Sequence, residues 1–202
     1  MNRRLILIRI IYRTLLAAGI VALLWVGGQL GYAKTYQVYL ISKLKAQSAL
    51  ANGTSDAISP LPSSPRTGDI VGRLDIPERK ISVVVLEGVE DDALGIAAGH
   101  VPGTSLPGSR GNVVIAAHRD TFFRELRNID VGDGIQLTTP GGTFDYFVSK
   151  TEIVNPSETR VLESSGRSEL TLITCYPFSF LGAAPQRFIV HARPQSDRSG
   201  ND

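Results

Sequence analysis

The chain has 202 residues, of which 43% are hydrophobic and 20% are charged, a length that fits one domain of ordinary size and a leader. Residues 1–50 contain seven Lys and Arg and no acidic residue, whereas residues 51–202 contain 14 basic and 19 acidic residues, a net charge of −5. Nucleic-acid binding requires a basic surface, so this distribution excludes nucleic acid as the expected partner of the domain.

The leader has the pattern of a membrane anchor. Thr14–Tyr32 are 19 consecutive uncharged residues, about the length that crosses ~30 Å of hydrocarbon. Four arginines precede this segment, and the positive-inside rule therefore predicts a cytoplasmic N-terminus at 1–13, a single span at 14–33 and an extracytoplasmic remainder. A cleaved signal peptide is the alternative, because Gly31-Tyr32-Ala33 fits a small-x-small cleavage site, but the apolar segment is longer than the usual signal core.

Gly27 and Gly31, within the span, form a GxxxG pattern that could support a weak anchor-mediated dimer.

Residues 34–68 connect the span to the domain. Beyond the span, the spacing of Val38 and Ile41 predicts that a helix continues to about residue 50. From residue 52 to residue 68 the composition shifts to Gly, Ser, Pro and Thr, which predicts an extended tether.

Residues 69–194 have the pattern of an all-β domain, followed by a polar tail at 195–202. Short runs of alternating apolar residues are separated by turn signals, which favours a closed or nearly closed barrel. The expected strands are 70–76, 81–86, 113–117, 134–138, 143–151, 169–174 and 187–192, and the expected short helices are 91–97 and 122–129.

Cys175 is the only cysteine of the chain, so it forms no intramolecular disulfide. Alternation along the expected strand places Leu170, Leu172 and Thr174 on one face and Thr171, Ile173 and Cys175 on the other. The leucines suit the core, and Cys175 then ends the strand on the outer face, beside a loop. A reactive nucleophile and a buried structural thiol are both compatible with this position.

A nucleophilic thiol needs a basic partner, because the thiolate is its reactive form. His118 ends an apolar run at a second strand terminus, whereas His100 lies in the expected loop Gly99–Gly111 and His191 lies late in the last strand. A Cys and a His at two strand ends could meet at one rim of a barrel. Arg187 begins the last strand on the face opposite to the core, where its guanidinium must reach an acid, solvent or a developing oxyanion.

Other chemistries lack their signatures in this sequence. The glycine-rich segment Gly103–Gly111 lacks the Gly-Lys-Ser/Thr of a phosphate-binding loop. The Cys and His residues do not have zinc-ligand spacing. We therefore expect neither a metal nor a cofactor.

Three motifs together resemble the sortase family. They are Ala116–Phe122 (AAHRDTF), Thr171–Cys175 (TLITC) and, further on, Arg187. The resemblance runs from about Asp69 to Pro194, and the form of the cysteine motif together with Phe122-Phe123-Arg124 is most similar to class D.

The resemblance implies a cysteine transpeptidase on an eight-stranded barrel. Cys175 would attack an LPxTG-like sorting signal of an exported protein, His118 would be the general acid/base and Arg187 would hold the oxyanion, while Thr174 and His100 would line the substrate groove. The acceptor would be a primary amine, either of a peptidoglycan precursor or of a protein lysine. Three alternatives stay open: a cysteine hydrolase, an L,D-transpeptidase-like cell-wall enzyme, whose Ser-x-Gly-Cys motif fits poorly here, and a non-enzymatic tethered β-domain.

Overall fold

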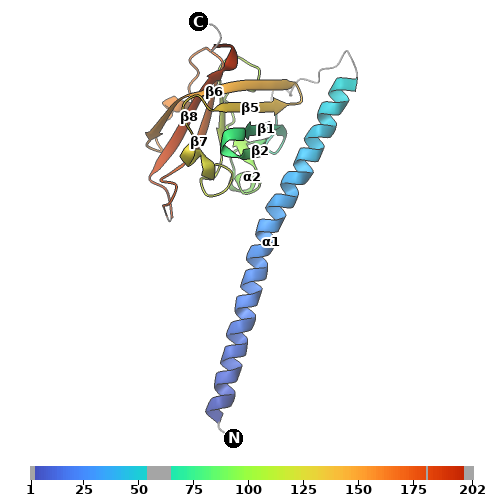
Figure 1. Ribbon diagram of the computed structural model, residues 1–202, viewed down its shortest axis with the longest axis vertical. Coiled ribbons are helices and arrows are strands. Elements are labelled where there is room, and N and C mark those ends of the chain that lie inside the picture. The colour runs from blue at the N-terminus through green and yellow to red at the C-terminus, as the bar shows by residue number, and fades with distance from the viewer. Residues whose placement is uncertain (1–2, 54–64, 181, 198–202) are drawn as a thin grey trace.

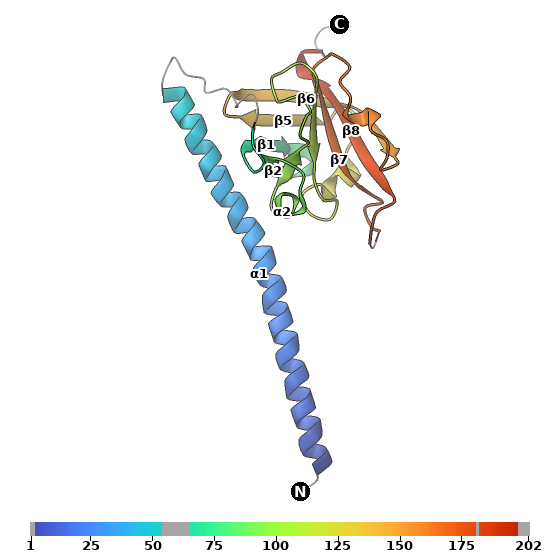
Figure 2. The ribbon, with the colours of Figure 1, turned by 180° about the vertical axis from the view of Figure 1, so that it is seen from behind.

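The computed structural model describes residues 3–53, 65–180 and 182–197. One long helix, α1 (Arg3–Gly53), runs along one side of a β-barrel, and the N-terminal half of the helix extends well beyond it (Figure 1). The reverse view shows the same arrangement, with the 3₁₀ helix Gln195–Asp197 at the end of the barrel that faces away from the helix N-terminus (Figure 2).

Eight strands form one closed barrel. They are β1 (Ile70–Ile76), β2 (Ile81–Glu87), β3 (Ala98–His100), β4 (Asn112–Ala116), β5 (Gly134–Thr139), β6 (Gly142–Val154), β7 (Glu169–Tyr176) and β8 (Gln186–Pro194). Their order around the barrel is β1-β2-β3-β4-β7-β8-β6-β5, and β5 pairs with β1 to close it. The predicted fold, a barrel that follows an apolar N-terminal helix, is confirmed.

The strand directions define one rim of the barrel. The pairs β2–β3 and β4–β7 are parallel, whereas the other neighbouring pairs are antiparallel. Because β4 and β7 run in the same direction, their carboxyl ends lie at the same rim. Strand β8 is antiparallel to β7 and therefore begins at that rim. We call this end of the barrel the β4–β7 rim.

Alternate residues of the strands fill the barrel. Leu170 and Leu172 of β7 and Val190 and Ala192 of β8 are at most 1% exposed and belong to one apolar core. The inward-facing residues of β7 and β8 are thus those that the alternation predicted. Their burial fixes the register, since a slip by one residue would turn every core side chain outward.

The short elements differ from the prediction. Strand β3 has three residues and includes His100, which the sequence had placed in a loop. So short a strand has no visible alternation, and its pairing with β2 and β4 supplies the order instead. The expected helix 91–97 is the single turn α2 (Asp91–Leu94), and the expected helix 122–129 is a 3₁₀ helix. The 3₁₀ helices are Pro77–Arg79, Arg124–Asn128, Arg160–Leu162 and Gln195–Asp197.

The leader forms one continuous helix, α1, in which the expected span and the expected continuation to about residue 50 are not separated. Its part Ile8–Gly28 is long and apolar enough to cross a membrane and makes no contact that buries it. Further along, Leu40 is 4% exposed and packs with Ile41 on the outer face of β2. Val38, which the helical spacing had grouped with Ile41, is instead 68% exposed.

Candidate active site

The strand register brings three of the predicted site residues to the β4–β7 rim. In the parallel ladder Ala116 of β4 is the partner of Ile173 of β7, so the chain that continues to His118 runs beside the chain that continues to Cys175. In the antiparallel ladder Cys175 is the direct partner of Arg187. Each of the three side chains is partly exposed, which is the condition under which a thiol, an imidazole and a guanidinium can meet a substrate.

Two hydrogen bonds hold the His118 segment against β7 after the ladder ends. The Ala117 amide donates to the Ile173 carbonyl over 3.2 Å. The Thr174 hydroxyl donates to the Ala117 carbonyl over 2.7 Å. These bonds bind the residue before His118 to the residues before Cys175. The backbone segments that carry the His118 imidazole and the Cys175 thiol are therefore fixed relative to each other.

Arg187 is positioned by its own backbone. Its Nη1 donates to the Ala184 carbonyl over 3.3 Å and to the Gln186 carbonyl over 3.0 Å. Among the described residues no carboxylate pairs with Arg187, and Nη1 is its only guanidinium nitrogen with a hydrogen-bond partner. The Nε and Nη2 donors of a permanently charged group thus remain for an anionic ligand beside Cys175.

The outer face next to Cys175 is apolar. Ile173 lies two residues before Cys175 on the same face of β7 and packs against the cluster of Val154, Val161 and Ile189. Val161 belongs to the 3₁₀ helix Arg160–Leu162, which precedes β7 and covers this face. The strand that ends in Cys175 is therefore supported on its outer face by a small buried apolar cluster.

Three aromatic rings pack together at the β4–β7 rim, on the face of β7 and β8 opposite to Cys175 and Arg187. Tyr176 and Phe178 contact each other edge to face at 6.0 Å between ring centroids, and Phe178 contacts Phe188 in the same way at 5.4 Å. Tyr176 also stacks on Phe188 at 6.3 Å. Such pairs stabilise by about 0.5–1.5 kcal/mol each beyond their burial. They connect the end of β7 to the start of β8 beside Cys175 and Arg187.

Arg119, the residue after His118, joins the two loops of the rim. Its Nη2 donates to the Phe180 carbonyl over 2.6 Å and to the Gly182 carbonyl over 3.0 Å. Both carbonyls belong to the β7–β8 connection. The Nη1 atom is buried and has no hydrogen-bond partner within the described chain. Arg119 was not predicted from the sequence to belong to the site, although its place next to His118 was a signal that could have indicated it.

Thr174 and His100 were expected in the groove, and both side chains are buried, with exposures of 2% and 1%. His100 Nδ1 lies 2.7 Å from Glu87 Oε2, and its Nε2 lies 3.0 Å from the Ser105 carbonyl oxygen. The Glu87 side chain is 8% exposed, so the pair is enclosed between β2 and the loop after β3. The structure does not bring His100 to the thiol, and no sequence signal had indicated Glu87.

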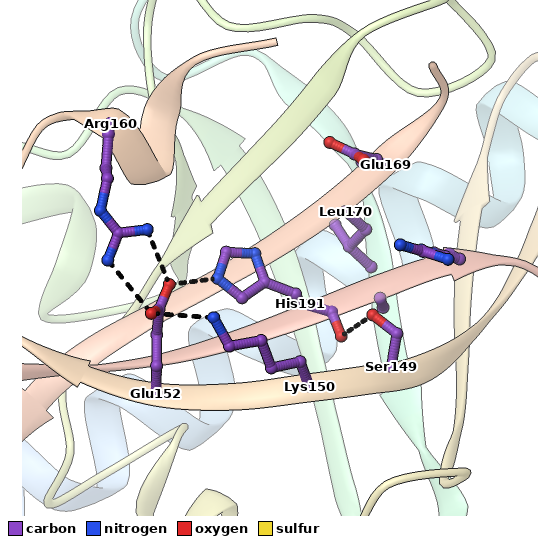
Figure 3. A pocket seen from close by; sticks show the side chains of 9 residues that line it. Ser149, Lys150, Glu152, Arg160, Glu169, Leu170 and His191 are labelled. Carbon is purple, nitrogen blue, oxygen red and sulfur yellow. Dashed lines mark hydrogen bonds and ion pairs between the residues drawn. The ribbon is translucent and has the colours of Figure 1, made fainter. Parts of the chain in front are cut away.

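His191 belongs to a separate charged pocket on the outside of β6 and β8 (Figure 3). Its Nε2 lies 2.8 Å from Glu152 Oε1, and Lys150 and Arg160 bind the same carboxylate at 3.0 and 3.1 Å. Hydrogen bonds from His191, Arg160 and Lys150 outweigh desolvation and lower the pKa of Glu152 to about 2. His191 is the ladder partner of Thr171, four residues before Cys175, so it is not at the rim. The described residues include no cluster of three or more His, Cys, Asp or Glu that could hold a metal ion.

Comparison with known proteins identifies the class. The sortase domain family matches residues 74–195. Sortase D of Bacillus subtilis (strain 168) is 34% identical over 166 residues, which are 79% of this chain and 84% of the relative. Sortase A of Bacillus anthracis is 29% identical over 110 residues, 52% of each chain. A solved sortase D5 transpeptidase of Clostridium perfringens superimposes with a TM-score of 0.59 at 31% identity over 65% of this chain and 82% of that one.

A single thiol at the rim of a closed barrel is the framework of a cysteine transpeptidase, and both the fold and the sequence matches agree with that class. Within it, the chain belongs to the sortase family. The resemblance seen in the sequence, including its similarity to class D, is thereby confirmed.

Proposed function

We propose that this chain is a membrane-anchored sortase that cleaves an LPxTG-like sorting signal and transfers the new acyl group to a primary amine. The observation that carries the proposal is the register of three strands, which sets Cys175 directly opposite Arg187 and beside the segment that ends in His118. Amide exchange needs a covalent acyl carrier, a proton shuttle and an oxyanion donor, and these three groups supply them.

The first half-reaction forms a thioester. The Cys175 thiolate adds to the carbonyl carbon of the threonine in the signal, and the carbonyl oxygen becomes an oxyanion to which Arg187 donates. When this intermediate collapses, the C–N bond breaks and the leaving amine takes a proton from the His118 imidazolium. The products are the Cys175 thioester and the free C-terminal fragment of the substrate.

The second half-reaction restores the enzyme. An incoming primary amine attacks the thioester carbonyl and gives its extra proton to neutral His118, and the tetrahedral intermediate expels the Cys175 thiolate. The new amide bond replaces the one that was broken, so neither an external oxidant nor ATP is required. Candidate acceptors are a peptidoglycan precursor and a protein lysine, and the substrates are exported proteins with a C-terminal sorting signal.

Burial favours supporting roles for Thr174 and His100 rather than direct contact with the peptide. The Thr174 hydroxyl holds the backbone before His118. The His100 imidazole bridges β2 and the loop that returns to β4. Both residues would then act on the site through the backbone that they position.

The anchor places the domain outside the cytoplasmic membrane. The span Ile8–Gly28 follows a basic N-terminus, which is the arrangement of a single-pass protein with its N-terminus inside. Because Cys175 is the only thiol, a membrane-impermeant maleimide tests this directly in intact cells. Labelling of wild type but not of Cys175→Ala supports the orientation, whereas labelling only after cell lysis would overturn it.

The function is tested with the full chain and a fluorogenic LPxTG peptide. Cys175→Ala should remove both cleavage and transfer while leaving the circular dichroism spectrum unchanged, because no other group can form the thioester. Activity above a few per cent of wild type in a folded variant would overturn the assignment of the nucleophile. A hydrolase that uses the same residues is the second candidate. The two are separated by measuring whether an added amine acceptor changes the ratio of ligated to hydrolysed product.

A further inference from the structure

Strand β2 is apolar on both of its faces. Val83 and Val85 point into the barrel core, whereas Val84 and Leu86 point outward. A barrel strand whose outer face meets water normally alternates between apolar and polar residues. Val84 and Leu86 are nevertheless 0% and 3% exposed, so another part of the chain covers them.

Helix α1 is part of that cover. Leu40 is 4% exposed and packs with Ile41 against the outer cluster of Val84, Leu86 and Ala97. Adjacent positions on the same helix face solvent: Val38 is 68% exposed and Tyr39 is 56% exposed. Among the side chains that the structure describes on this part of α1, Leu40 and Ile41 make the contact.

The contact lies close to the end of the membrane-spanning segment. Leu40 is twelve residues beyond Gly28 and seven beyond Ala33, the expected end of the span, which at 1.5 Å per helical residue is ~10–18 Å along the helix. A domain of about 130 residues has a radius of gyration of ~14 Å. The radius of the barrel is therefore comparable with the distance from Leu40 to the membrane, and the near edge of a barrel fixed at Leu40 lies close to the membrane surface.

The orientation of the barrel on α1 directs one rim toward the membrane. The connection between β7 and β8 lies at the β4–β7 rim, which holds Cys175 and Arg187. In both views the end of β7 and the start of β8 lie toward the helix N-terminus, and the 3₁₀ helix Gln195–Asp197 lies at the opposite end of the barrel (Figures 1 and 2). The rim with the thiol therefore faces the side on which the apolar span lies.

We propose that the Leu40 contact fixes the barrel on its own anchor with the Cys175 rim turned to the bilayer, so that the enzyme favours polypeptides whose scissile bond is held at a set short distance from the membrane. This inference rests on the proposed transpeptidase function and on the span being retained. Among the described residues, this contact is what fixes the direction of the rim relative to α1.

The test uses the full chain in liposomes and one LPxTG peptide in two forms, free in solution or fused to a membrane-spanning helix by a short spacer. Wild type should cleave the membrane-held form at least about tenfold faster at equal total concentration, because anchoring raises the effective concentration of a correctly placed substrate. Leu40→Asp should remove most of this preference and retain the rate on the free peptide. Val38→Asp, two residues away and already exposed, is the matched control and should behave as wild type.

A second variant leaves the Leu40 contact intact and changes only the distance between the barrel and the membrane. Eleven helix-forming residues inserted after Lys34 raise the barrel by ~16 Å with nearly unchanged helical phase. The preference for the short-spacer substrate should fall and should return when the substrate spacer is lengthened to match. An unchanged preference in both Leu40→Asp and the insertion variant would overturn the proposal. If wild type did not cleave the free peptide at all, the proposed function itself would be contradicted. The failure of the proposed function can therefore be distinguished from the failure of the membrane proposal.

Discussion

Cys175 of β7 and Arg187 of β8 are direct partners in an antiparallel ladder, on the outer face of the barrel. Directly opposed residues in such a ladder have Cβ atoms about 4.5–5.5 Å apart, so a thiol and a guanidinium are held together without any flexible loop. Ladder pairing on both sides and the aromatic rings behind the rim restrain the pair. A tetrahedral oxyanion formed at Cys175 would therefore find its donor already in place.

Arg187→Lys separates charge from geometry at this pair. Lysine keeps the positive charge but lacks the planar fork whose Nη1 binds the Ala184 and Gln186 carbonyls. We expect kcat to fall about 10²–10³-fold in Arg187→Ala and by a smaller factor in Arg187→Lys, with little change in KM. Steady-state kinetics on the peptide checks this. A large rise in KM at constant kcat would assign Arg187 to substrate binding instead.

His118→Ala should lower kcat by about 10²–10⁴-fold, the usual contribution of a positioned proton shuttle. His191→Ala provides the control, because His191 lies in the pocket of Glu152 and not at the rim. The measurement is the turnover of both variants under identical conditions. Equal losses in the two would show that the wrong histidine has been chosen as the acid/base.

The alternation of the sequence predicted the positions of Cys175 and Arg187, because in a strand the face of each side chain follows from the faces of its neighbours. Once Leu170 and Leu172 must face the core, Cys175 must face outward, and the same argument fixes Arg187 from Val190 and Ala192. The other longer strands were found from similar runs between turn signals, although β2 and β4 contain continuous apolar runs instead of alternating. The motif resemblance then supplied the association with His118.

Other features depended on contacts that no local pattern records. The buried pair of His100 and Glu87 joins residues 13 positions apart through a three-residue strand, which is too short to show a period. The covering of Val84 and Leu86 by Leu40 brings together residues more than 40 positions apart. The continuous apolar run of β2 carried a signal that both faces are buried, but it could not identify what covers the outer one.

Arg119 offers a test of whether the two rim loops act together. Its bonds to the Phe180 and Gly182 carbonyls fix the β7–β8 connection beside His118, so Arg119→Ala should lower kcat by roughly tenfold through misplacement of the site. Arg119→Lys, which can still donate to a carbonyl, should recover part of the loss. Hydrogen exchange of the backbone amides of residues 178–180 should rise in Arg119→Ala. If Arg119→Ala had wild-type kinetics and unchanged hydrogen exchange, the hydrogen bonds from Arg119 to the two carbonyls would have no role in turnover.

Glu152 links stability to acidity away from the site. Hydrogen bonding with His191 and the nearby cations hold its pKa at about 2, below the ordinary value of 4.5. A lowered pKa means that the ionised form stabilises the fold above pH ~4.5 and that this contribution is lost as the pH falls toward 2. Because solvent screens the cluster, we expect Glu152→Gln to cost only about 1 kcal/mol at pH 7.

Urea unfolding of wild type and Glu152→Gln between pH 7 and pH 2.5 measures this contribution. The difference in unfolding free energy between the two proteins should shrink as the pH falls. A difference that stays constant over the whole range would mean that the carboxylate makes no net use of its cationic neighbours. Turnover at pH 7 should be nearly the same in both proteins, because the cluster lies outside the rim.

The fate of the acyl group on Cys175 tests the account most directly. Full-length enzyme is incubated with an LPxTG peptide and increasing concentrations of an amine acceptor, such as a glycine peptide or a lysine-containing stem peptide, and ligated and hydrolysed products are quantified by mass spectrometry. A transpeptidase predicts that the ratio of ligated to hydrolysed product rises with acceptor concentration and that total turnover rises with it. A ratio that stays near zero with several acceptors at high concentration would contradict transfer and identify a cysteine hydrolase.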